Sequence, residues 1–225
     1  MLKKYTIAID GPAGAGKSTV ARGVAQALGH RYVDTGSMYR AITLLALQKN
    51  VDLNDQHAMN KLAENAKIEI VAVNGDQQRL LLNSEDVTEK IRDPLVTGSV
   101  SKVASIPGVR KVLTSLQSAL ASGGGVVMEG RDIGTVVMPD ADFKFYTIAS
   151  TRERAGRRAM DLEKMGHAVD FEKLIEEIDA RDYTDSNREI NPLKPADDAE
   201  IIDCTAMSAQ EVIDFIVHRV TGGRI

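Results

Sequence analysis

Residues 9–19 read Ile9-Asp10-Gly11-Pro12-Ala13-Gly14-Ala15-Gly16-Lys17-Ser18-Thr19, and residues 11–18 match the phosphate-loop pattern G-x-x-x-x-G-K-[ST]. Glycines let the backbone curl so that several N–H groups point at one anion. Lys17 adds a mobile positive charge for the β- and γ-phosphates, and the Ser18 hydroxyl can bind Mg²⁺. The stretch predicts a nucleotide-phosphate site, and a chance glycine-rich turn is the alternative.

The segments on either side of this loop support the phosphate-site interpretation. Residues 5–9 form a short, nearly all-apolar run, which is typical of a strand buried in a parallel sheet. After the loop, five apolar residues share one helical face, and Gly29 provides a stop: Val20, Ala21, Val24, Ala25 and Leu28. Such a helix presents its positive N-terminal end to phosphates.

Strand and helix patterns then alternate along most of the chain. Further strands are expected at 31–33, 125–128, 143–148 and 201–203, and further helices at 38–47, near Leu95, after Pro107, on either side of Gly166 and at 209–220. This alternation predicts an α/β fold with a parallel sheet covered on both sides.

One segment breaks the alternation. Between about residues 66 and 87, Ile68, Ile70 and Ala72 alternate with other positions, and Asn74-Gly75 is a strong hairpin signal. We therefore expect a nucleotide-binding core formed by residues 1–62 and 104–225, with an antiparallel subdomain inserted at 63–103.

Three polar clusters remain to be explained. Residues 34–40 follow a predicted strand, where Arg40 could pair with a phosphate; a helix cap with a surface arginine is the alternative. Residues 128–135 also leave an apolar strand and place Arg131 beside Asp132; a solvated turn is the alternative. Residues 152–188 are rich in arginine, and salt-bridged exposed helices are the alternative to a phosphoryl-transfer role.

Composition excludes several classes of protein. The chain has 225 residues, a formal net charge of −4 and no Trp, which argues against nonspecific or stacking-based nucleic-acid binding. The single cysteine, Cys204, rules out an intrachain disulfide and is expected to be a small buried hydrophobe. No apolar run is long enough to span a membrane. The single cysteine suits a reducing cytosol, so a cytoplasmic location is expected, and the protein is also expected to be a monomer.

At these motifs the sequence resembles the bacterial cytidylate kinases. The matching stretches are residues 9–19, 34–40, 130–137 and 181–188, spread over nearly the whole chain. The resemblance implies a five-stranded parallel sheet, an inserted monophosphate-binding subdomain at 63–103 and an arginine-bearing lid at about 152–188. It also implies Mg²⁺-dependent transfer of the ATP γ-phosphoryl group to CMP or dCMP.

The resemblance assigns roles to individual residues. The ATP phosphates would be bound by Gly11, Pro12, Ala13, Gly14, Ala15, Gly16, Lys17, Ser18 and Thr19, with the lid residues Arg154, Arg157 and Arg158 close by. The acceptor phosphate would be held by Arg40, Arg131 and Arg188. The cytosine edge would meet Ser101, Arg110 and Asp132, and the sugar hydroxyls would meet Arg181 and Asp185. Thr35 and Tyr39 complete the CMP set, and Lys17, Arg131, Asp132, Arg158 and Arg188 would be catalytic.

Two rival functions share the phosphate loop. One is a small-metabolite kinase of the shikimate kinase type. The long insert and the many arginines instead favour an acceptor that already carries a phosphate. A nonenzymatic nucleotide-binding regulator or RNA-binding module would leave those arginines without use. A GTPase is disfavoured because Asn60-Lys61 is followed by Leu62-Ala63 and lies in a predicted helix.

Overall fold

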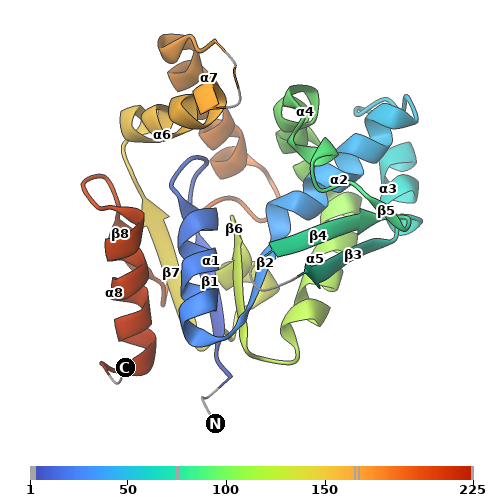
Figure 1. Cartoon of the computed structure of the whole chain (residues 1–225). Coiled ribbons are helices and arrows are strands. Elements are labelled where there is room, and N and C mark those ends of the chain that lie inside the picture. Colours follow the sequence, from blue (N-terminus) through green and yellow to red (C-terminus); the bar gives the residue numbers. More distant parts are fainter. Residues whose placement is uncertain (1–3, 74–76, 165, 167, 224–225) are drawn as a thin grey trace. The chain divides into compact units, whose positions relative to one another are not determined.

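The computed structural model describes residues 4–73, 77–164, 166 and 168–223, which divide into two compact units (Figure 1). The first unit comprises residues up to Tyr32 and from Gly123 onward, and the second runs from Val33 to Ser122. The second unit is therefore wider than the subdomain expected at 63–103.

A five-stranded sheet with the order β2-β6-β1-β7-β8 forms the framework of the first unit. The strands are β1 (Thr6–Asp10), β2 (Arg31–Asp34), β6 (Val126–Gly130), β7 (Phe143–Ile148) and β8 (Glu200–Asp203). β1 pairs in parallel with β6 and β7, and β7 pairs in parallel with β8. The predicted parallel sheet is confirmed, and β1 lies at its centre because its residues are apolar on both faces.

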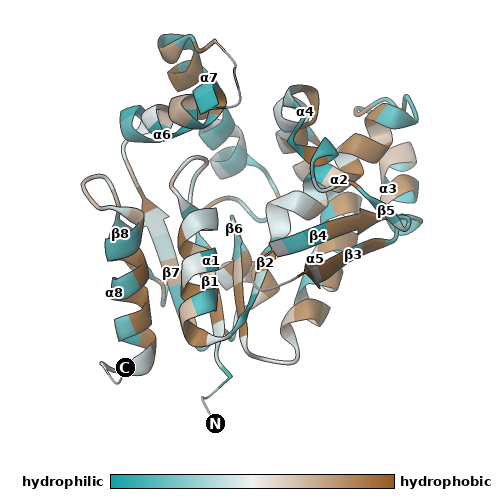
Figure 2. Ribbon diagram, in the orientation of Figure 1, coloured by the Kyte–Doolittle hydropathy of each residue, from teal (hydrophilic) through white to brown (hydrophobic). Residues whose placement is uncertain are grey.

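Two helices of the first unit pack on this sheet and on each other. α1 (Lys17–Leu28) and α8 (Ala209–Thr221) share an apolar core with the central strands, which includes Ile7, Val24 and Ile216. Figure 2 shows bands of apolar and polar residues along α8, as expected of a helix with one buried face. Cys204 is 1% exposed in this core, which confirms its prediction as a buried hydrophobe.

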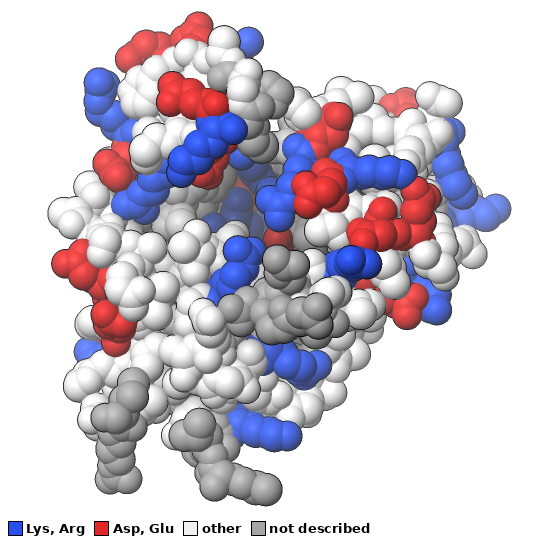
Figure 3. Space-filling model, in the orientation of Figure 1, with Lys and Arg blue, Asp and Glu red and all other residues white. Residues whose placement is uncertain are grey.

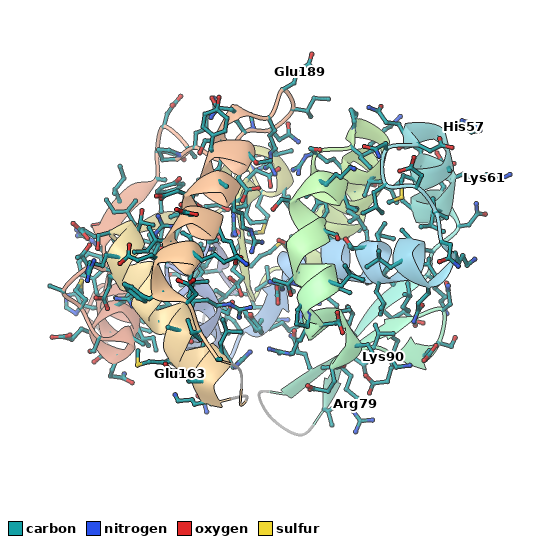
Figure 4. All side chains as sticks on the ribbon, turned by 90° about the horizontal axis from the view of Figure 1, so that it is seen from above. His57, Lys61, Arg79, Lys90, Glu163 and Glu189 are labelled. Carbon is teal, nitrogen blue, oxygen red and sulfur yellow. The ribbon has the colours of Figure 1, made fainter. Side chains whose placement is uncertain are left out.

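A helical hairpin, α6 (Thr151–Lys164) and α7 (Phe171–Asn187), follows β7 in the first unit. It has a small core of its own, formed by Ala155, Ala159, Leu174 and Ile178. Figure 3 shows acidic and basic side chains interspersed over its outer surface. Glu163, labelled in Figure 4, lies in the last turn of α6 and is exposed.

The second unit combines several helices with a small antiparallel sheet. The helices are α2 (Thr35–Gln48), α3 (Gln56–Glu64), η1 (Lys90–Arg92), α4 (Pro94–Ala104) and α5 (Pro107–Ala121); the strands are β3 (Ile68–Val73), β4 (Gln77–Leu82) and β5 (Glu85–Asp86). β4 pairs with both β3 and β5, so the inserted antiparallel strands are confirmed. The predicted Asn74-Gly75 turn lies outside the described residues.

The second unit extends beyond 63–103 because its core does. α2 and α5 contribute Ile42 and Leu113 to the same apolar cluster that buries Leu80 and Leu82 of β4. Asn60-Lys61 lies within α3, which confirms that this pair is helical. His57 and Lys61 of the same helix point outward (Figure 4). None of the helices in the described ranges is long and apolar enough to span a membrane.

Candidate active site

The phosphate loop connects β1 to α1 in a conformation that glycine alone adopts easily. Gly11 has a φ of 149°, and a Cβ there would lie 2.2 Å from the carbonyl oxygen of Thr147. Gly16 is the N-cap of α1 with a φ of 83°, and no side chain accepts a hydrogen bond at this cap. The first N–H groups of α1 therefore have no acceptor from the cap residue, as an anion-binding helix start requires.

Lys17 is the buried cation of the loop. Its Nζ donates to the carbonyl oxygen of Pro12 at 2.6 Å, and the residue is 6% exposed. Burial, together with the charge of Arg131, lowers the pKa of Lys17 to about 7, and the charge of Glu129 opposes this shift. An incoming phosphate would provide the counter-charge that this side chain needs.

Two ion pairs join the loop after β6 to the end of the α6–α7 hairpin. Arg131 Nε donates to Asp185 Oδ2 at 2.9 Å, and Arg188 Nη2 lies 3.6 Å from Asp132 Oδ1. The side chains of Arg188 and Asp132 are 5% and 8% exposed. The structure thus brings together four predicted residues in two ion pairs, and the partners of each pair are more than 50 positions apart in sequence.

The charges in this cluster influence one another. Burial opposes ionisation of Asp185, but Arg131 and Arg181 together hold the pKa of Asp185 below its ordinary value. Burial likewise works against the charge of Arg131, whereas Asp185 raises the pKa of Arg131. Arg181 acts electrostatically on both Asp185 and Lys17, so it belongs to the same cluster. Guanidinium groups that bind carboxylates in this way can also bind phosphate oxygens.

Arg154 contacts the phosphate loop itself. Its Nη1 donates to the carbonyl oxygen of Ala13 at 2.9 Å and pairs with Asp182, while its Nε donates to Ala149 at 3.0 Å. The backbone N–H of Ala13 in turn donates to Asp182 Oδ1 at 3.3 Å. The predicted contact of Arg154 with ATP stays a prediction, since its guanidinium here binds protein groups.

The other two lid arginines lie further along α6. Arg157 Nη2 donates to the carbonyl oxygen of Cys204 at 2.7 Å, and its Nη1 lies 3.6 Å from the Cβ position of Gly16. Arg158 is half-buried on the following position. Arg157 is thus next to the start of α1, where the ATP phosphates are expected.

Two buried carboxylates near the loop had no predicted role. Glu129 is 4% exposed on β6 and accepts a hydrogen bond of 2.5 Å from the hydroxyl of Tyr32. Asp10 is 4% exposed at the end of β1 and accepts from the backbone N–H groups of Ile133 and Gly134. An acidic residue that ends an apolar strand immediately before a phosphate loop was the available signal.

The second unit holds the remaining predicted residues. Thr35 begins α2 and is 3% exposed, and Asp34 caps this helix by accepting from the Ser37 N–H at 3.0 Å. The guanidinium carbon of Arg110 lies 5.5 Å from the ring centroid of Tyr39, close enough for a cation–π interaction.

The other predicted residues of this unit are Ser101 on α4 and Arg40 on α2. Ser101 lies three positions before Ala104, whose carbonyl oxygen accepts a hydrogen bond of 2.9 Å from Arg110 Nη1. Arg40 is half-buried one position after Tyr39, with its Nη1 3.7 Å from the Cβ position of Gly36. The helix cap expected at residues 34–40 is present, and the pairing of Arg40 with a phosphate stays a prediction.

Comparison with known proteins identifies the family to which this chain belongs. The cytidylate kinase family model matches residues 7–222. This chain belongs to the cytidylate kinase family. It is 53% identical over 218 residues to a cytidylate kinase of Pelotomaculum thermopropionicum, covering 97% of this chain and 96% of that one. It is 51% identical over 224 residues to one of Desulforamulus reducens, covering 100% of both chains.

One solved structure shares the fold at low sequence identity. An uncharacterized protein from Eubacterium ventriosum has a TM-score of 0.51 and 11% identity, covering 98% of this chain and 99% of that chain. This likeness concerns the fold alone. Membership of the cytidylate kinase family excludes the shikimate kinase type and the nonenzymatic regulator as the function of the chain.

The residues present fit the Mg²⁺ that a cytidylate kinase would use. In the described part of the chain, no cluster of three or more His, Cys, Asp or Glu is arranged to hold a metal ion. Mg²⁺ at nucleotide sites is usually held by few protein groups together with phosphate oxygens and water. The exposed Ser18, at the second position of α1, can supply such a group.

Proposed function

We propose that this member of the cytidylate kinase family transfers the γ-phosphoryl group of ATP to CMP or dCMP, yielding ADP and CDP or dCDP. One observation supports this reaction most strongly. A phosphate loop with a buried Lys17 shares one unit with the ion pairs Arg131–Asp185 and Arg188–Asp132. The phosphate loop can bind the phosphates of the donor nucleotide, and the arginines can bind the phosphate of the acceptor.

The donor nucleotide is bound by residues 11–19. Their backbone N–H groups and the N-terminus of α1 stabilise the phosphates, and Lys17 regains its proton beside them. Ser18 would hold Mg²⁺, which neutralises charge on the phosphates. Arg154, Arg157 and Arg158 belong to the lid formed by the α6–α7 hairpin, and Arg158 acts on the transferring group.

Each unit has residues that we assign to the acceptor nucleotide. In the first unit, Arg131 and Arg188 exchange Asp185 and Asp132 for the acceptor phosphate, Asp132 then becomes available to cytosine, and Asp185 and Arg181 meet the sugar hydroxyls. In the second unit, Arg40 is assigned to the acceptor phosphate, and Ser101 and Arg110 are assigned to cytosine. The unit from Val33 to Ser122, with Thr35 and Tyr39, is the monophosphate-binding part of the chain.

The transfer proceeds in line and without a covalent enzyme intermediate. Lys17 and the arginines neutralise charge on the transferring group, and positioning lowers the remaining barrier. A hairpin that closes over the nucleotides excludes water and limits hydrolysis of ATP.

An ADP-release assay with ATP–Mg²⁺ and CMP, dCMP, UMP, AMP or GMP tests the reaction and the base. We expect strong turnover with CMP and dCMP. We also expect Arg188→Ala to raise KM for CMP at least about tenfold, whereas Arg219→Ala, which removes an exposed pair with Glu200, should not. Turnover with another monophosphate alone would reject the cytosine assignment, and no turnover with any would reject the kinase.

The finer physiological setting is also a proposal. The net charge of −4 disfavours a nucleic-acid partner. We also propose that the protein acts on its small-molecule substrates as a cytoplasmic monomer. Light scattering of the purified protein checks the oligomeric state, and a mass of twice 24.4 kDa would contradict it.

A further inference from the structure

Asp10 binds two consecutive backbone amides that lie 123 and 124 residues further along the chain. Its Oδ1 accepts from the Ile133 N–H at 2.9 Å, and its Oδ2 accepts from the Gly134 N–H at 2.8 Å. The side chain is 4% exposed. Both carboxylate oxygens are therefore committed to one short turn in a buried environment.

That turn is η2 (Ile133–Val137), a π-helical turn that begins directly after Asp132. Ile133 and Gly134 stand at its start, where N–H groups have no acceptor within the turn. An N-cap side chain normally accepts from such groups. Asp132 is the N-cap residue here, but its side chain makes no capping hydrogen bond.

The carboxylate of Asp132 has another partner. It lies 3.6 Å from Arg188, a residue that the proposed function assigns to the acceptor phosphate. If Asp132 capped its own turn, its carboxylate would face the Ile133 and Gly134 amides instead.

Asp10 also fixes this turn to the phosphate loop. It is the last residue of β1, its Cα is in register with Gly130 of β6, and Gly11 follows it directly. Its carbonyl oxygen accepts from the Thr147 hydroxyl at 3.3 Å. One residue thus joins the start of the donor site to the loop that carries Arg131 and Asp132.

We infer that Asp10 is a positioning residue of the kinase: it caps η2 in place of Asp132, which holds Arg131 and Asp132 beside the phosphate loop and leaves the Asp132 carboxylate available to the acceptor. This role rests on the proposed function. It predicts that Asp10 affects turnover through geometry, without touching either nucleotide.

Asp142, which directly precedes β7, provides a matched control because it binds the first residue of β1. It accepts hydrogen bonds from the Thr6 N–H at 2.8 Å and the Thr6 hydroxyl at 2.9 Å, at the opposite end of β1. Asp142→Asn therefore weakens an equivalent pair of hydrogen bonds far from the phosphate loop, although at a more exposed position. Asp10→Asn keeps one acceptor and turns an NH₂ group toward the other amide.

The experiment compares both variants with the wild type well below their melting temperatures. For Asp10→Asn we expect kcat to fall at least about tenfold while binding of a nonhydrolysable ATP analogue changes less than about twofold. For Asp142→Asn we expect kcat to stay within about twofold of the wild type. Asp10→Glu keeps the charge but lengthens the side chain, so it should also lower kcat and can be used if the Asn variant does not fold.

Amide NMR resonances of Ile133 and Gly134 give a readout that does not depend on the reaction. Both should move, and their hydrogen exchange should accelerate, in Asp10→Asn but not in Asp142→Asn. Unchanged amides, or full kcat in both Asp10 variants, would overturn the inference. If the wild type phosphorylates no monophosphate, the proposed function fails, whereas the capping role is still decided by these amides.

Discussion

Arg154 and Asp182 hold the peptide groups of Ala13 between them. Arg154 Nη1 donates to the Ala13 carbonyl oxygen at 2.9 Å, the Ala13 N–H donates to Asp182 Oδ1 at 3.3 Å, and the two side chains pair with each other. The arrangement ties α6 and α7 to the phosphate loop. It also places a carboxylate on a backbone N–H of that loop, so bound phosphate would compete with Asp182 for this position.

Removing Asp182 should destabilise the fold. Asp182→Ala leaves the guanidinium of Arg154, 6% exposed, without its anionic partner, and we expect the free energy of unfolding to fall by about 3 kcal/mol. Urea denaturation measures this change. The control is Glu153→Ala, which removes the exposed partner of Arg157 on α6 and should cost less than about 0.5 kcal/mol. Equal losses for both variants would contradict the prediction.

Lys17 should be essential for turnover but not for folding. Lys17→Ala removes the cation that neutralises the transferring phosphoryl group, so we expect kcat to fall at least about a hundredfold. Circular dichroism should show an unchanged fold. Arg22→Ala, on the same helix, removes a cation stacked 5.3 Å from the Tyr32 ring and should retain kcat. Near-normal turnover of Lys17→Ala would remove the basis for the kinase assignment.

ATP binding should take up a proton through Lys17. Burial and Arg131 lower the pKa of Lys17 to about 7, so most of the side chain is neutral at pH 8, and bound phosphates restore its proton. Calorimetry in buffers of different ionisation enthalpy should show uptake at pH 8 that disappears below pH 6. Uptake that persists at pH 8 in Lys17→Met would assign the proton to another group.

The lowered pKa of Lys17 also determines how the free energy of unfolding depends on pH. The folded-state pKa of about 7 lies below the ordinary value of 10.5, so the unfolded chain binds more protons between these values. The free energy of unfolding contributed by Lys17 therefore increases as pH rises from 7 to 10.5. Lys17→Met should lose this increase in urea denaturation series.

Gly11 should not tolerate a side chain. Its φ is 149°, and a Cβ would meet the Thr147 backbone oxygen at 2.2 Å, so Gly11→Ala should lower the free energy of unfolding by about 2 kcal/mol or more. Gly156→Ala is the matched control, because it lies inside α6 with no atom within 4 Å of its Cβ position. That variant should gain about 0.5–1 kcal/mol from reduced backbone freedom. Thermal denaturation of both variants distinguishes the two directions.

Local patterns predicted the framework of this molecule well. The phosphate loop, its flanking strand and helix, and the helices around Gly166 depend on residues close in sequence, and the structure has them. The family resemblance assigned Arg131 and Asp185 to the same nucleotide, but their direct ion pair was not predicted.

Long-range contacts account for most of what the sequence did not reveal. Asp10 caps a turn more than 120 residues away, and a π-helical turn has no periodic signal of its own. Arg154 belonged to an arginine-rich run that suggested phosphate binding, yet its guanidinium contacts two backbone carbonyls, the Thr151 hydroxyl and Asp182. The wider second unit depends on tertiary packing of α2 and α5 with β4, which no single segment encodes.

The α6–α7 hairpin buries Ala155, Ala159, Leu174 and Ile178 within itself, and Arg152 stacks on Phe171 at 5.4 Å. Because these contacts lie within the hairpin, its packing depends little on the five-stranded sheet. The hairpin can therefore keep its own shape while its exposed outer charges vary, provided that its apolar interior, the Arg154–Asp182 pair at Ala13 and the residues assigned to the nucleotides are retained.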